Sequence, residues 1–115
     1  MSAPFAAIGT AGSALRVYRT WLDTVSHNIA NTNAPRAAGA PPFRPQAVVA
    51  RTVDTDPRSG QAGGIEVAAI VETDDEANLA DQMVQMMVAQ RAYQSNLAVV
   101  DRARDSYLAA LQIGR

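Results

Sequence analysis

The chain lacks cysteine and lysine, and aromatic residues make up only 5% of it. Without cysteine, the 115 residues contain no disulfide, no thiol nucleophile and no cysteine-based metal site. The cations are arginines, and ten arginines against eleven acids leave a formal net charge of −1 with neither half strongly basic. We therefore expect no nucleic-acid partner, because nucleic-acid surfaces need clustered positive charge.

Long apolar runs are also missing. No stretch approaches the roughly 20 apolar residues that a membrane-spanning helix needs, so we expect no membrane insertion. Arg16 and Arg19 interrupt the N-terminal segment early, so we expect no cleaved secretory signal. Alanine supplies much of the 48% apolar fraction, which predicts a modest core and apolar surface that meets a partner.

Patterns typical of catalysis or metal binding are absent from the sequence. His27 has no candidate nucleophile pattern near it, so we interpret it as structural or solvent-facing. Asp74, Asp75 and Glu76 lack the glycine turn and distal glutamate of a calcium loop, and helix capping explains them better. The glycine-rich residues 60–64 precede a predicted strand, whereas a phosphate-binding loop precedes a helix. We expect no enzyme activity, cofactor, metal ion or small-molecule substrate.

Residues 5–30 carry a heptad pattern that predicts a helix with a narrow apolar seam for one partner helix. The seam residues are Ile8, Leu15, Tyr18, Leu22, Val25 and Ile29, with Ala11 between the first two. Residues 32–45 hold four prolines with glycine and alanine, and they are predicted to form a loop.

Two short strands are predicted at residues 46–53 and 65–72. A loop of turn-forming residues joins them, which indicates a β-hairpin. Simple alternation would place Ile65, Val67, Ala69 and Val71 on one face of the second strand. Because an isolated hairpin is only marginally stable in water, we expect it to pack on the helices or on another subunit.

A second, longer helix is predicted within residues 73–115. Residues 73–76 match a capping box, and residues 78–81 offer another possible start. Polar residues at Gln90, Asn96 and Arg104 interrupt its seam; such residues either fix register or, for Arg104, reach out to the rim. The apolar seam residues are Leu79, Met83, Met86, Tyr93, Leu97, Val100, Tyr107 and Leu111.

The expected fold is therefore mainly α. Long N- and C-terminal helices pack as an antiparallel coiled-coil pair, and a small β-hairpin lies between them. The expected segments are 1–31 (helix), 32–45 (connector), 46–72 (hairpin) and 73–115 (helix), which together form one structural unit.

Sequence motifs at both ends of the chain carry a resemblance to a known family. The stretch SHNIANTNAP, residues 26–35, is similar to the motif that ends the N-terminal helix in flagellar axial proteins, among them the flagellar basal-body rod family. The stretch RAYQSNLAVVDRARDSYLAALQIGR, residues 91–115, is similar to their C-terminal helix. Between them, FRPQAVVA and GGIEVAAIVE resemble the hairpin region of type C proximal rod proteins. Those proteins carry a longer segment before the last helix, whereas here Glu72 leads almost directly into Asn78.

The resemblance implies a structural subunit that is exported by the flagellar type III export apparatus without a cleaved signal. Such subunits polymerise in the periplasm into the rod, which transmits torque, and their terminal helices pack on copies of themselves and on other rod subunits. It also implies that Asn28, Ala30 and Asn31 form the motif that stops the first helix, and asparagine suits such a stop because it tolerates the left-handed conformation. The alternative is a small helical adaptor or regulator of flagellar export and assembly.

Overall fold

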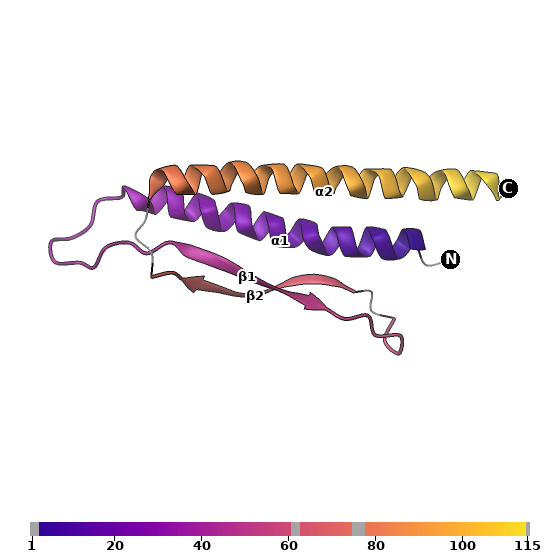
Figure 1. Cartoon of the computed structure of the whole chain (residues 1–115), viewed down its shortest axis with the longest axis horizontal. Helices are drawn as coiled ribbons and strands as arrows, with labels where there is room; N and C mark the ends of the chain where they lie inside the picture. The colour runs from indigo at the N-terminus through magenta and orange to yellow at the C-terminus, as the bar shows by residue number, and fades with distance from the viewer. Residues whose placement is uncertain (1–2, 61–62, 75–77, 115) are drawn as a thin grey trace.

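The protein is an elongated molecule of two helices and one hairpin. The computed structural model describes residues 3–60, 63–74 and 78–114, with side chains described from residue 8. Its elements, in chain order, are α1 (Ala3–Thr32), β1 (Gln46–Val53), β2 (Gly64–Glu72) and α2 (Leu79–Ile113). The helices lie side by side and antiparallel, and the hairpin runs along the side of α1 away from α2 (Figure 1). The molecule measures 70 × 29 × 16 Å, and the expected mainly α fold is confirmed.

Helix α2 begins at the second of the two predicted starts. Asn78 is the N-cap, and its side-chain oxygen accepts hydrogen bonds from the N–H groups of Ala80 at 2.9 Å and Asp81 at 3.4 Å. These bonds satisfy two of the backbone donors that have no partner inside the helix. The alternative capping box includes Asp75 and Glu76, which lie outside the described residues.

The hairpin is antiparallel, and its register runs from Gln46 opposite Glu72 to Val53 opposite Gly64. An irregularity between Val49 and Ala50 shifts this register, as a β-bulge does. The bulge interrupts the simple alternation that was expected along β2. Burial also differs between the two halves of the strand: Ile65 and Val67 are half-buried, whereas Ile70 and Val71, on opposite faces, are 50% and 42% exposed.

The loop between the strands is closed by turn chemistry. Asp56 accepts a 2.9 Å hydrogen bond from the Arg58 N–H, and Gly60 adopts the left-handed conformation with φ of 73°. Hydrogen bonds from the Arg58 N–H and from Ser59 hold the pKa of the Asp56 carboxyl below its ordinary value.

Helix α1 is the middle layer of the molecule, because it contacts α2, β1 and β2. The buried apolar residues of the described part are few and mostly small: Ala11, Val17, Val25 and Ala89. Buried polar side chains accompany them, namely Thr24, Asn28 and Gln82. The core therefore depends on hydrogen bonding as well as on apolar burial. Among the described residues, neither helix has the length and apolar character needed to span a bilayer.

Candidate assembly interface

The face of α2 that lies on α1 consists of two series of residues, each spaced by seven positions. All nine members are buried or half-buried: Leu79, Met86, Tyr93, Val100 and Tyr107 in one series, and Gln82, Ala89, Asn96 and Ala103 in the other. The first series was predicted in full. The second has small or amide side chains, and Ala89, which is fully buried, allows the helices to approach closely.

The predicted second series lay one position further along the chain and does not belong to this intrachain face. Its members are exposed, namely Met83, Gln90, Leu97, Arg104 and Leu111. The prediction favoured large apolar residues, whereas the helix pair uses alanine and amides at these positions. The signal that could have identified them is the seven-residue spacing of Gln82, Ala89, Asn96 and Ala103. Asn96, which was predicted as a polar seam residue, does face α1.

Asn96 joins α2 to the backbone of α1 near the N-terminal end of that helix. Its side-chain N–H donates to the Ala11 carbonyl oxygen at 2.6 Å. That carbonyl lies in the helix interior and already accepts within α1, so the contact adds a second donor to one backbone oxygen. A donor placed at one position along α1 fixes the register of the two helices.

Asn28 forms a second and more extensive contact between the elements. Its side chain is 1% exposed, and its amide N–H groups donate to the Gln46 carbonyl at 2.9 Å and to Gln82 Oε1 at 3.0 Å. Its oxygen accepts from the Gln46 N–H at 2.8 Å. The carboxamide therefore pairs with the first residue of β1 as a neighbouring strand would, and it also holds α2.

The first helix was expected to end at the motif formed by Asn28, Ala30 and Asn31, and it does end within one residue of Asn31, although Asn28 itself lies inside the helix. Helix α1 continues to Thr32, and the described non-glycine residues include none with positive φ. Asn31 lies in the last turn, where its side chain donates to the His27 carbonyl at 2.8 Å, and Ala30 is exposed. The helix ends before Pro35, which has no backbone N–H and disfavours helical geometry at the preceding residue.

The predicted seam residues of α1 are divided between its two neighbours. Val25 is buried, and Ile8, Leu15, Leu22 and Ile29 are half-buried. Tyr18 instead lines a groove of about 290 Å³ beside the hairpin, together with Val17, Trp21, Val48, Ala50 and Ile65. Because α1 is covered on two sides, its apolar stripe is wider than the single seam that the heptads indicated.

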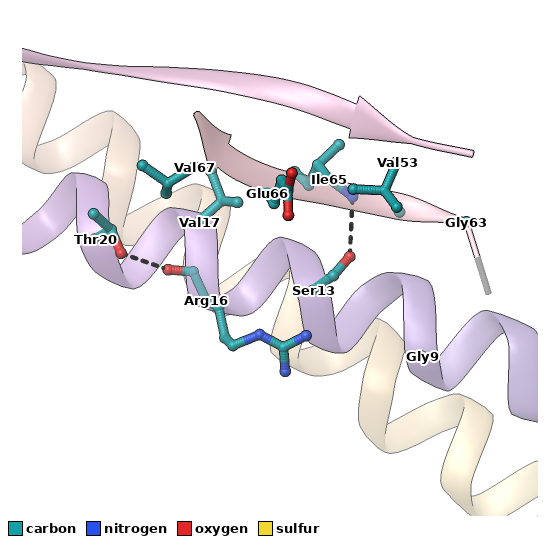
Figure 2. Close-up of a pocket in the computed structure, with 11 residues that line it drawn as sticks. Gly9, Ser13, Arg16, Val17, Thr20, Val53, Gly63, Ile65, Glu66 and Val67 are labelled. Carbon is teal, nitrogen blue, oxygen red and sulfur yellow. Dashed lines mark hydrogen bonds between the residues drawn. The ribbon is translucent and has the colours of Figure 1, made fainter. Parts of the chain in front are cut away.

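The turn end of the hairpin is fastened to α1 by hydroxyl groups. Ser13 Oγ accepts from the Ile65 N–H at 3.1 Å, as Figure 2 shows, and Thr10 Oγ1 donates to the Gly63 carbonyl at 2.8 Å. A Cβ at Gly64 would collide with Ser13 Oγ, so the close approach of strand and helix requires glycine there. Arg16 points away from the hairpin in the same view (Figure 2).

An apolar patch remains on the side of α2 away from α1. We define the outer patch as Met83, Val84, Met87 and Val88, which are 55%, 58%, 68% and 52% exposed. These residues occupy the same turns as Gln82, Met86 and Ala89, but they project from the opposite side of the helix. Contiguous exposed apolar patches mark interaction surfaces. Among the described residues, no cluster of acidic and histidine side chains is suited to hold a metal ion.

Comparisons with known proteins show what this chain is similar to. The family described as Flagellar basal body rod FlgEFG protein C-terminal matches residues 77–113, which include all of α2. The flagellar basal-body rod protein FlgC of Salmonella typhimurium is 28% identical over 128 aligned residues, which cover 91% of this chain and 93% of that protein. FlgC of Borreliella burgdorferi is 25% identical over 146 residues, covering 95% and 96%. Both alignments are longer than the 115-residue chain and so contain gaps. The likeness extends from one terminal helix to the other, so over nearly its whole length the chain is similar to flagellar basal-body rod proteins, and to FlgC in particular.

Proposed function

We propose that this protein is a structural subunit of the flagellar rod, which assembles through its terminal helices into the periplasmic drive shaft that transmits torque. The observation that carries the proposal is that α2 has two opposite surfaces suited to contacts. One side of this 35-residue helix lies on α1, and the other side bears the exposed outer patch. Such a helix has an apolar surface to offer a neighbour after its own chain has folded.

The predicted seam residues that are exposed in the single chain gain a role in this proposal. Met83 belongs to the outer patch, and Leu97 and Leu111 are 39% and 48% exposed further along α2. We propose that they contact neighbouring subunits, either copies of this chain or other rod proteins. The similarity to FlgC, a basal-body rod protein, supports partners of this kind.

The proposal also covers how the subunit reaches its place. We propose export through the flagellar type III apparatus without a cleaved signal peptide, followed by assembly in the periplasm as one unit of two helices and a hairpin. The role is structural and not catalytic. The similarity to basal-body rod proteins supports the basal-body location.

Fractionation of the source bacterium tests this function. Basal bodies purified from a strain that carries the tagged chain should contain it in a fixed ratio to the other rod proteins, and a deletion strain should lack both rod and hook. A chain found only in the cytoplasm, with rods that assemble normally in the deletion strain, contradicts the proposal. That outcome would favour an adaptor of export or assembly.

A further inference from the structure

The hairpin and α2 are both docked on α1. In the described part of the chain, the backbones of both strands lie close to α1, and neither strand backbone lies close to that of α2. Near the N-terminal end of α1, Thr10 and Ser13 hold the hairpin while Asn96 holds the Ala11 carbonyl, so different groups serve the two dockings there. Near the C-terminal end of α1, one side chain serves both.

That side chain is Asn28, and its hydrogen-bonding capacity is divided between the two partners. One amide N–H is given to the Gln46 carbonyl and the other to Gln82 Oε1, while the amide oxygen accepts from the Gln46 N–H. A carboxamide is planar, so the position of one N–H determines the direction of the other. With the side chain 1% exposed, water cannot readily replace a lost partner.

We propose that Asn28 is a conformational junction that makes the docking of the hairpin and the pairing of α2 with α1 one coupled event. When Gln82 accepts from Asn28, the plane of the carboxamide is set to receive Gln46. When the hairpin departs, the same plane is free to turn and Gln82 loses its donor. Coupling of this kind is reciprocal, so a change that weakens the docking of the hairpin must also weaken the pairing of α2 with α1, and the reverse. The inference concerns the single folded chain and does not depend on the proposed function.

A variant of α2 tests the first direction. Gln82→Met keeps the length and helix propensity of the side chain but removes the acceptor for Asn28. Gln85→Met is the matched control, because Gln85 is exposed and lines the same small cleft beside Pro45, Gln46 and Ala47. The measurement is amide hydrogen exchange of the full chain by NMR, read at the Gln46 N–H. We expect Gln82→Met to speed this exchange about threefold or more, and Gln85→Met to leave it unchanged.

A variant of the hairpin tests the reverse direction. Gln46→Pro removes the backbone N–H that donates to Asn28 Oδ1. Proline is tolerated there because residue 46 is the first of its strand. Gln46→Ala is its control, because it keeps that N–H. We expect the proline variant to speed the exchange of the α2 amides in the turns around Gln82, and the alanine variant to leave them as in the wild type.

The outcomes separate coupling from a local effect. If Gln82→Met speeds exchange only within α2, or if the proline and alanine variants at Gln46 behave alike, the junction does not exist. A general loosening of the chain by Gln82→Met would speed exchange at the Ile65 amide, far from Asn28, as much as at the Gln46 amide, and would also overturn the proposal. If Gln82→Met prevents folding, as judged by far-UV circular dichroism, the comparison of the two Gln46 variants decides by itself.

Discussion

Replacement of Asn28 by alanine should be among the most damaging single changes that this chain can undergo. The variant loses three hydrogen bonds made by a side chain that is 1% exposed. At about 1 kcal/mol for each bond, with a further penalty for the Gln46 groups and Gln82 left without a partner, the loss is about 3–5 kcal/mol. Alanine is the better helix former and offsets about 0.5 kcal/mol of this loss. The net expectation is about 3 kcal/mol or more, a large part of the roughly 5–15 kcal/mol that holds a typical domain together.

Urea unfolding at 25 °C, followed by far-UV circular dichroism, measures this loss, and Asn31→Ala is the matched control. Within the described part of the chain, the Asn31 side chain donates to the backbone and ring of His27 in its own helix, and these bonds are exposed. Because alanine's helix propensity compensates for them, we expect this control to stay within about 0.5 kcal/mol of the wild type. A loss below about 1 kcal/mol for Asn28→Ala, or equal losses for the two variants, would refute the assignment of Asn28 as the central polar contact.

Four further predictions concern other parts of the molecule. Ala89→Leu should lower the free energy of unfolding by about 1–3 kcal/mol, because the larger side chain overpacks against α1, whereas Gln90→Leu should change it little. Similar urea midpoints for the two variants would show that the helix face is misassigned. Gly64→Ala should destabilise the chain and speed hydrogen exchange of the Ile65 amide, because the new Cβ meets Ser13; a stabilising effect would contradict this. Gly12→Ala, whose new Cβ meets open space, should stabilise the chain by about 0.5–1 kcal/mol. Leu97→Asp should leave the circular dichroism of the isolated chain intact and abolish motility, and motile cells would remove Leu97 from the subunit contacts. Because the folded-state pKa of Asp56 is lowered, its carboxylate stabilises the fold above the ordinary carboxyl pKa, and this contribution is lost as the pH falls through the lower folded pKa. An NMR titration should find the pKa of Asp56 below its ordinary value, and an ordinary or raised pKa would contradict the turn geometry.

The periodicity of the sequence was sufficient to predict the elements of the fold and their order. Heptads gave both helices, and β-branched runs around a turn-rich loop gave the hairpin. The bulge in β2 could not be predicted, because no residue in GIEVAAIVE distinguishes a regular strand from one with a shifted register. The end of α1 was predicted to within one residue, but the role of the Asn28 side chain was missed because asparagine was judged by its local tendency to end helices. In the structure, the Asn28 side chain is occupied by partners 18 and 54 residues away.

The interface was predicted in part for a related reason. A heptad pattern defines two series of positions, and on α2 the choice of the second series rests on side-chain chemistry. Met83 and Leu97 are more apolar than Gln82 and Asn96, so burial alone favours the wrong pair. The helix pair selects the amides because they can donate to Ala11 or accept from Asn28, contacts that exist only when α1 lies alongside. Partners of this kind are properties of the tertiary structure and leave little trace in a local pattern.

The distances along the chain between these contacts suggest an order in which the molecule assembles. Asn28 reaches Gln46 across 18 residues, whereas Asn96 reaches Ala11 across 85. From loop-closure entropy alone, the longer connection is less favourable by about 1.4 kcal/mol. Formation of the hairpin removes most of this difference, because it brings the two ends of residues 46–72 together and so places the start of α2 near the end of α1. The hairpin thus shortens the effective loop between the two helices, which can then pair first at Gln82 and afterwards along α2 toward Asn96. Of the hydrogen bonds described between the two helices, the one between Asn96 and Ala11 then forms later and opens earlier than the one between Asn28 and Gln82.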